Sequence, residues 1–183
     1  MKYKLSFITL CMMLMSPVFA AEEITVDYTY GGEPRVDLAN MSRGPLKIGN
    51  FSDSRNGDPK LITDAAGGYI ADRPLAEIVR DALAQGLGKA NAQLVESGEN
   101  MTLVGTVVSS EATMLDENGV SSIRLTIRTQ VQLRGSGRTI WQTVLFGRGT
   151  APQSEGIEQA LANALDRTIS GLLQDQYFLI EIQ

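Results

Sequence analysis

The sequence predicts an α+β fold, a two-layer sandwich in which two amphipathic helices pack on one face of an antiparallel sheet. Two observations support this prediction. Apolar and polar residues alternate through much of residues 101–148, as in half-buried strands. Two other segments, residues 72–90 and 154–174, carry apolar residues at helical spacing along a single stripe. Helices with one apolar face bury it against another element, so these strands and helices predict two layers.

The run "SSIRLTIRTQVQL", residues 121–133, is the most regular strand of the predicted sheet. It places aliphatic side chains on one face, whereas Arg124 and Arg128 lie with other polar residues on the opposite face. Upstream, Asn118-Gly119 predicts a two-residue hairpin turn that pairs residue 117 with residue 120. Counting outward from this turn gives the pairs Met114 with Ile123, Ala112 with Leu125, Val108 with Thr129 and Val104 with Leu133.

Downstream, "RGSGR" makes a second hairpin, whose register depends on the length of its loop. A three-residue loop places Trp141 and Leu145 on the apolar face. A two-residue loop instead places Ile140, Val144 and Phe146 there. We favour the two-residue loop, because it buries more apolar surface and uses the commoner turn. Trp141 is then expected on the outer face.

The remaining elements are shorter. "ITVDYTY" (residues 24–30), "PLKIGNF" (residues 45–51), "AQLVE" from Ala92 and the final "YFLIEI" are expected to be strands. Asp72 and Ser154 are the candidate caps of the two helices.

A long segment, residues 52–73, connects the second strand to the first helix. Loops of this length in compact domains are usually functional or mobile. Asp53 and Arg55 at its start are expected to pair and to fix the loop against the sheet. The acidic residues of the segment lack the fixed alternation of oxygen donors and the final glutamate of a calcium loop, so we expect no metal site.

The amino terminus predicts export. Two lysines, an apolar run and the small residues Val18 and Ala20, three residues and one residue before the cleavage point, are typical of a cleavable signal peptide spanning residues 1–20. The apolar run is too short to span a bilayer, and Cys11 lies in its middle instead of at its end, where a lipid-modified cysteine would be. Cleavage leaves residues 21–183 as a single periplasmic α+β domain with no transmembrane segment.

Composition excludes several functions. The chain has no histidine, and its one cysteine leaves with the signal peptide, so Ser-His-Asp hydrolysis, thiol chemistry, His/Cys zinc sites and disulfides are excluded. The formal net charge of −5 becomes −7 once the two signal lysines are removed, which argues against a nucleic-acid partner. We expect no cofactor and no catalytic residue.

The candidate binding residues form two groups. Arg124, Arg128 and Trp141 on the outer sheet face could hold an anionic or glycan ligand through charge, bidentate hydrogen bonds and stacking. The alternative is a plain solvated sheet face. Asp53 and Arg55 in the long loop form the second group.

Several of these segments together resemble the YajG family of Gram-negative cell-envelope lipoproteins. They are an export signal, the turn Asp53-Ser54-Arg55 after a strand, the helix "RPLAEIVRDALAQGL", a three-stranded meander and the helix "IEQALANALDRTISGLL". The likeness covers most of residues 44–175. It implies an envelope protein without enzymatic activity and supplies no catalytic residue. Members of that family carry a lipobox cysteine, which the mature chain lacks.

The sequence therefore favours a non-enzymatic periplasmic protein that serves as a binding or accessory module for an envelope protein complex or component, held at the outer membrane, if at all, through a partner. One alternative is a structural subunit that joins a larger envelope complex by adding its last strand or an exposed sheet edge to a partner. A second is a carboxylate-based hydrolase of envelope glycan.

Overall fold

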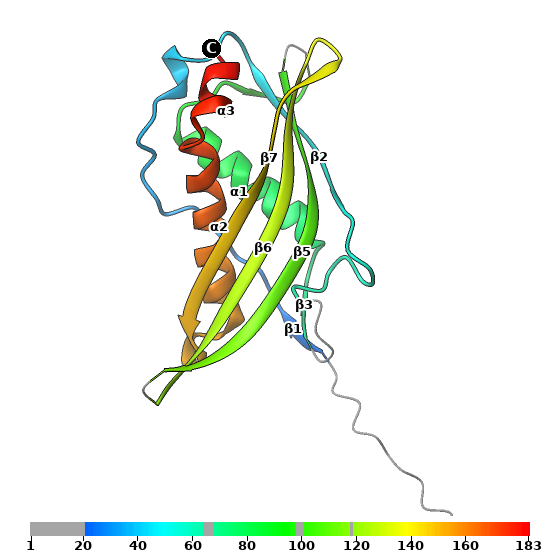
Figure 1. Cartoon of the computed structure of the whole chain (residues 1–183), viewed down its shortest axis with the longest axis vertical. Helices are drawn as coiled ribbons and strands as arrows, with labels where there is room; N and C mark the ends of the chain where they lie inside the picture. The colour runs from blue at the N-terminus through cyan, green and yellow to red at the C-terminus, as the bar shows by residue number, and fades with distance from the viewer. Residues whose placement is uncertain (1–20, 64–67, 98–100, 118) are drawn as a thin grey trace, which may run out of the picture.

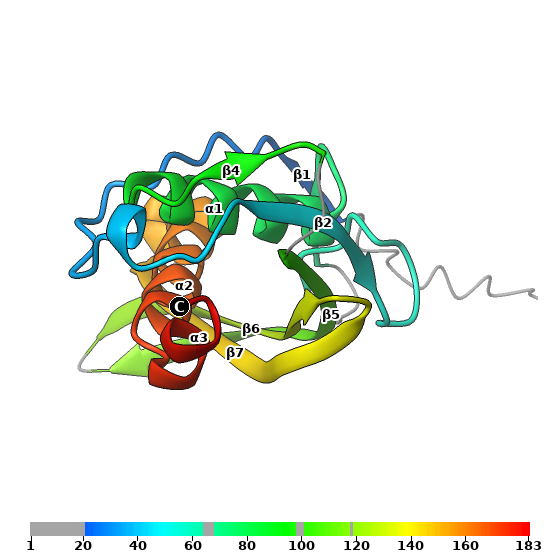
Figure 2. The same ribbon diagram turned by 90° about the horizontal axis from the view of Figure 1, so that it is seen from above.

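The computed structural model describes residues 21–63, 68–97, 101–117 and 119–183. Its helices and strands confirm the predicted α+β class (Figure 1). The main sheet curls around one side of the molecule, and helices α1 and α2 close the other side (Figure 2). The predicted signal peptide, residues 1–20, and Asn118 of the predicted hairpin turn lie outside the described residues.

The main sheet has five strands in the order β4-β2-β5-β6-β7. They are Leu46–Asp53 (β2), Leu94–Val95 (β4), Met101–Glu117 (β5), Val120–Gly135 (β6) and Arg138–Pro152 (β7). The three long strands form the predicted antiparallel meander. The sheet differs from the antiparallel prediction at one edge, because β2 runs parallel to both β4 and β5. Parallel neighbours need a crossover connection, which helix α1 supplies between β2 and β4.

Helices α1 (Leu75–Lys89) and α2 (Gly156–Leu173) bury the predicted apolar stripes in one core shared with the sheet. Neither helix has the predicted cap. The Asp72 carboxylate instead accepts a hydrogen bond from the backbone N–H of Val26 at 3.2 Å. Ser154 lies in a 3-10 turn, Gln153–Glu155, that precedes α2.

Helix α2 rests directly on β7 because two inward-facing residues of that strand are glycines. A Cβ atom on Gly149 would overlap the backbone O of Ala160 and the backbone N of Ala164. A Cβ atom on Gly147 would lie 2.6 Å from the backbone O of Ala164. Real Cβ atoms essentially never approach other atoms closer than 3.0 Å, so this helix–strand contact requires glycine at both positions.

The first hairpin keeps the predicted register only near its turn. Glu117 pairs with Val120, and the predicted pairs of Met114 and Ala112 are also confirmed. A β-bulge at Val108 then shifts the register by one residue, so Thr129 pairs with Val107 and Val104 pairs with Gln132. The predicted partners of Val108 and Val104 are therefore wrong, because the bulge inserts one unpaired residue into β5.

The second hairpin has the predicted two-residue loop, since Gly135 pairs with Arg138. Ser136 and Gly137 both have positive φ, as the tight turn requires. A bulge at Ile140 then shifts the register, so Leu133 pairs with Trp141. The expectation that Trp141 lies on the outer face is wrong: its side chain is 7% exposed and faces the core.

The carboxy-terminal segment is helical, in contrast to the predicted strand. Helix α3 spans Gln176–Glu181, and the Asp175 carboxylate caps it by accepting a hydrogen bond from the backbone N–H of Phe178 at 2.9 Å. The Phe178 ring is fully buried, with its centroid 5.1 Å from that of Trp141. The helix thus places Phe178 over the residue that the Ile140 bulge turns inward.

The amino-terminal segment forms a strand only at its start, where Glu22–Ile24 (β1) pairs in parallel with Tyr69–Ala71 (β3). The rest of the strand predicted over residues 24–30 belongs to a strap, residues 25–32, held by side chains of both helices. Gln85 of α1 accepts a hydrogen bond from the backbone of Tyr30 and donates one to the backbone of Tyr28. The Tyr28 hydroxyl donates to the carboxylate of Asp166 in α2 at 2.6 Å.

Candidate functional site

Arg124 and Arg128 lie on the outer face of β6, where the sequence places them. The guanidinium of Arg128 donates a hydrogen bond to Ser109 Oγ at 3.1 Å, and its Nη1 lies 3.5 Å from Glu111 Oε1. The Nε atom of Arg124 is buried and has no hydrogen-bond partner among the described residues. The outer face of β5 and β6 thus carries two arginines and one carboxylate within this short stretch.

Phe146 takes the place that the sequence analysis gave to Trp141. The Ile140 bulge turns it outward on β7, where its side chain is 40% exposed. The Arg128 guanidinium carbon lies 5.2 Å from the centroid of the Phe146 ring, and that of Arg148 lies 4.9 Å from it. We call Arg124, Arg128, Phe146 and Arg148 the Arg–Phe strip.

One sequence feature could have revealed this outward position. Gly147 and Gly149 occupy alternate positions of the strand, and alternate glycines are typical of a face that approaches another backbone closely. Residues 147 and 149 then face the helix, and residues 146 and 148 face outward.

Asp53 and Arg55 form the predicted pair. The guanidinium Nη2 of Arg55 lies 2.7 Å from Asp53 Oδ2, and Nε donates to both carboxylate oxygens. The two side chains are only 4% (Arg55) and 10% (Asp53) exposed. Because these groups are engaged and nearly buried, we assign the pair to support of the loop and not to the contact surface.

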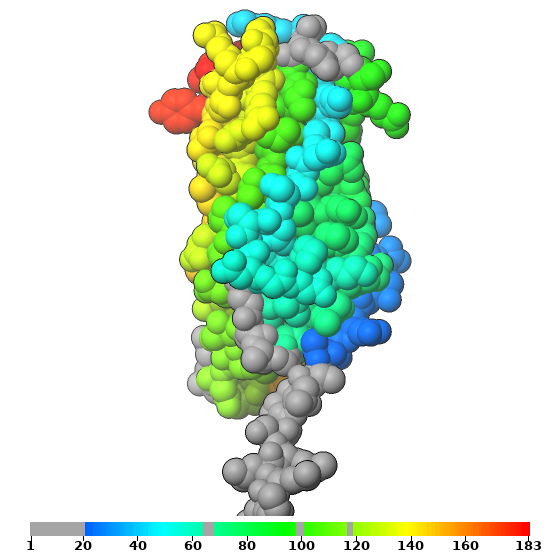
Figure 3. Space-filling view, turned by 90° about the vertical axis from the view of Figure 1, so that its right-hand side faces the viewer, coloured from blue at the N-terminus to red at the C-terminus, as the bar shows by residue number. Residues whose placement is uncertain are grey.

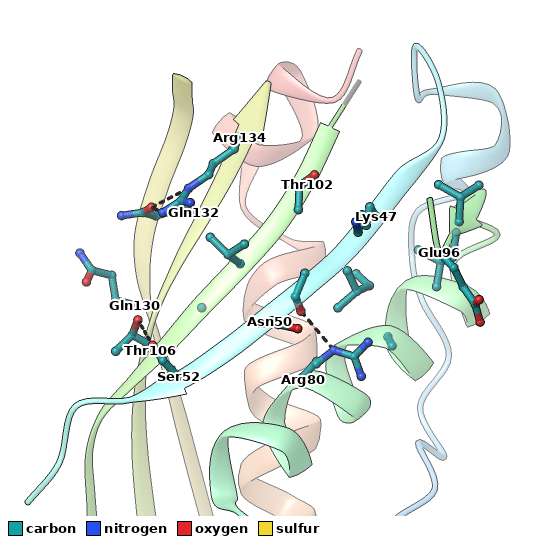
Figure 4. Close-up of a pocket in the computed structure, with 17 residues that line it drawn as sticks. Lys47, Asn50, Ser52, Arg80, Glu96, Thr102, Thr106, Gln130, Gln132 and Arg134 are labelled. Carbon is teal, nitrogen blue, oxygen red and sulfur yellow. Dashed lines mark hydrogen bonds between the residues drawn. The ribbon is translucent and has the colours of Figure 1, made fainter. Parts of the chain in front are cut away.

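A groove of about 1000 Å³ crosses the outer side of β2, β5 and β6 and reaches α1 and β4. We call it the β2 groove. Figure 4 shows β2 and β5 along its floor, β6 side chains on one side and α1 with β4 on the other. The charged residues in its lining are Lys47, Arg80, Arg134 and Glu96. Amides and hydroxyls add a further polar set, namely Asn50, Gln130, Gln132, Ser52, Thr102 and Thr106. Five separate elements build this groove, so no short motif predicts it.

The described residues contain no group of three or more His, Cys, Asp or Glu side chains placed to hold a metal ion. No helix in the described ranges combines the length and the hydropathy needed to cross a membrane. Among the ionisable groups described, Tyr28 stands out. Burial, followed by its hydrogen bond to Asp166, raises the pKa of Tyr28 well above its ordinary value. This tyrosine belongs to the strap and lies apart from the strip and the groove.

No family model matches the chain, and no curated protein sequence matches it either. Several solved structures are similar. Protein XCC0632 of Xanthomonas campestris, described as a DUF330 protein, has a TM-score of 0.57 and 15% identity, covering 86% of this chain and 95% of that chain. A minor lipoprotein of Acinetobacter baumannii has a TM-score of 0.40 and 14% identity, covering 73% of this chain and 88% of its own. The likeness to XCC0632 shows a shared fold.

Proposed function

We propose that this protein is a non-enzymatic binding module of the Gram-negative cell envelope, exported to the periplasm, which docks a partner protein on the Arg–Phe strip. Export is supported by the predicted signal peptide, and an envelope role by the resemblance to the YajG family. The single observation that carries the binding role is Phe146, an exposed ring whose centroid lies 5.2 Å from the guanidinium carbon of Arg128 and 4.9 Å from that of Arg148.

Such a strip has the composition of the energetic centre of a protein interface. Aromatic residues and arginine are enriched where a few side chains supply most of the binding free energy. Val144 precedes the strip on the outer face of β7 and is 53% exposed, which extends its apolar part. A partner that covers Phe146 would exclude water from both guanidinium groups and so strengthen their interaction with its carboxylates.

The partner surface should therefore combine an apolar centre with acidic side chains. The strip carries three arginines, and the Glu111 carboxylate lies 3.5 Å from Nη1 of Arg128. The Arg128–Glu111 pair is exposed, so it costs little to exchange for a carboxylate of the partner.

Photo-crosslinking in intact cells tests this proposal. A probe at Val144, next to the strip, should give a discrete protein adduct, whereas a probe at Gln159 on the exposed side of α2 should not. Phe146→Ala should lower the yield of that adduct about tenfold or more, because truncating an interface centre typically costs this much. Arg128→Gln should lower it in the same direction.

The control is the fold itself: both variants replace outer-face side chains and should keep the wild-type urea midpoint. Equal adducts from both probe positions, or an adduct that neither substitution changes, would contradict the proposal. If only lipid or glycan adducts form, the strip binds an envelope component and the proposal of a protein partner is wrong.

A further inference from the structure

The edge of β2 that faces away from β5 is only partly paired. Strand β4 pairs with Leu46 and Lys47 alone, although β2 continues to Asp53. Among the described strands, none pairs with residues 48–53 on this side. Unpaired backbone groups along a strand edge are a template for another strand. Among the described strands, β2 is therefore an edge strand from residue 48 to residue 53.

The space beside this edge is open. The β2 groove runs along β2 from Lys47 to Ser52 and includes the end of β4. A smaller hollow of about 540 Å³ continues it between β2 and α1, sharing Asn50 and Arg80 with the groove. Figure 3 shows the side of the molecule on which β2 lies between β5 and α1. An added strand would lie about 4.8 Å from β2. The two hollows lie along the lane that such a strand would take in line with β4.

One side chain reaches across this lane. Arg80 of α1 donates a hydrogen bond from Nε to the backbone O of Gly49 at 3.1 Å (Figure 4). Its Nη1 contacts Asp81 at 2.9 Å. Gly49 lies where the pairing of β2 with β5 shifts register, between Ile48 and Phe51. The guanidinium of Arg80 therefore occupies an edge carbonyl that a backbone N–H of an added strand would otherwise use. It is 40% exposed, so it can turn aside without a buried rearrangement.

We propose that the free edge of β2 accepts an extended segment of a partner protein, added in line with β4, with an acidic side chain that receives Arg80. The backbone of the segment would replace the bond of Arg80 to Gly49, and the freed Nε of the guanidinium, which keeps its contact with Asp81, would be offered to a second carboxylate. Lys47 and Arg134 of the groove favour the same charge, whereas Glu96 of the groove and Glu77 and Asp81 of the smaller hollow oppose it. This surface is separate from the Arg–Phe strip, so the proposal goes beyond the proposed function.

The test uses three capped synthetic hexapeptides and the mature protein. The first alternates valine with threonine and carries one central aspartate. The second has lysine in place of the aspartate, and the third is the first peptide with methyl groups on alternate backbone nitrogens. Binding is followed by backbone NMR shifts and by amide hydrogen exchange. We expect millimolar affinity for the aspartate peptide, with slowed exchange in residues 48–53, and about tenfold weaker binding of the lysine peptide.

Two arginine variants make the test specific. Arg80→Gln should reduce the preference for the aspartate peptide over the lysine peptide to less than about threefold, because a neutral side chain forms no charge-assisted hydrogen bond with the aspartate. Arg73→Gln is the matched control. Arg73 also contacts Asp81 but does not line the groove, so this variant should keep the full preference.

Three results would overturn the inference: no binding of the aspartate peptide at millimolar concentration, binding that backbone methylation leaves unchanged, or shifts confined to the Arg–Phe strip. The outcome is independent of the first proposal. Phe146→Ala should leave peptide binding at β2 unchanged, whatever it does to the adduct at Val144.

Discussion

Replacing Gly149 by alanine tests the close contact between β7 and α2. The new Cβ would overlap backbone atoms of Ala160 and Ala164, which cannot turn aside as a side chain can. Helix α2 would have to move away by roughly an ångström, and its buried stripe would lose contacts with the sheet. Overpacking of a core costs about 1–3 kcal/mol and occasionally more, and a clash with backbone belongs at the upper end. We expect a loss of about 3 kcal/mol, which lowers the Tm by about 6–12 °C in a domain of this size.

Urea unfolding followed by circular dichroism measures this loss, with the slope of the transition checked to be unchanged. Gly171→Ala is the matched control on α2. Its Cβ would meet Leu145 at 3.8 Å, an ordinary contact, so alanine should raise the stability by about 0.5–1 kcal/mol through its better helix propensity. A wild-type urea midpoint for Gly149→Ala would refute the reasoning. A loss of equal size in both variants would show only that the helix tolerates no substitution.

Three further substitutions test other parts of the fold by the same unfolding assay. Phe178→Ala should cost about 3–5 kcal/mol, because it empties a fully buried site beside Trp141; a loss below about 1 kcal/mol would mean that α3 does not hold the core. Asp53→Ala leaves a nearly buried guanidinium without this carboxylate and should cost about 3 kcal/mol, whereas a surface pair would cost less than about 1. Tyr28→Phe should cost about 1 kcal/mol near neutral pH by removing the bond to Asp166. Folding raises the pKa of Tyr28, so above about pH 10 the unfolded chain loses the phenol proton while the folded chain keeps it. The stabilisation by Tyr28 is therefore complete below about pH 10 and is lost as the pH rises further, and the unfolding free energies of wild type and variant should converge near pH 11. A difference that stays constant with pH would contradict this account.

Local patterns predicted the parts of the fold that depend on neighbours in the chain. The turn at Gly119 fixed the pairs near it, and the stripes of both helices are buried as expected. The bulges at Val108 and Ile140 were not predictable, because a single inserted residue leaves the alternation of the flanking segments intact. The side-chain period of a strand is two, so each bulge exchanges the two faces of everything beyond it.

The carboxy-terminal error has a different cause. "YFLIEI" is rich in strand-forming residues, and that propensity favoured a strand. The Asp175 cap and the burial of Phe178 decided the outcome in favour of a helix. Asp175 is a preferred N-cap residue, so the sequence also allows a helix that begins after it.

The site could be predicted only where it follows strand alternation. Arg124 and Arg128 lie on the outer face because they share parity within β6. The alternation does not show the bulge in β7, so the outward position of Phe146 could be inferred only from the alternate glycines Gly147 and Gly149. The β2 groove depends on which strands are neighbours, and no alternation pattern contains that information: β2 follows β1 in the chain but lies beside β5 in the sheet.

The amino-terminal strap has a consequence for the order of folding. Synthesis delivers Tyr28 early, but the carboxylate that receives its hydroxyl, Asp166, follows 138 residues later. Gln85 of α1 can hold the backbone of the strap before that point. The bond between Tyr28 and Asp166 can form only when almost all of the chain has been made, so it would fasten the strap to the second helix as a late step of folding.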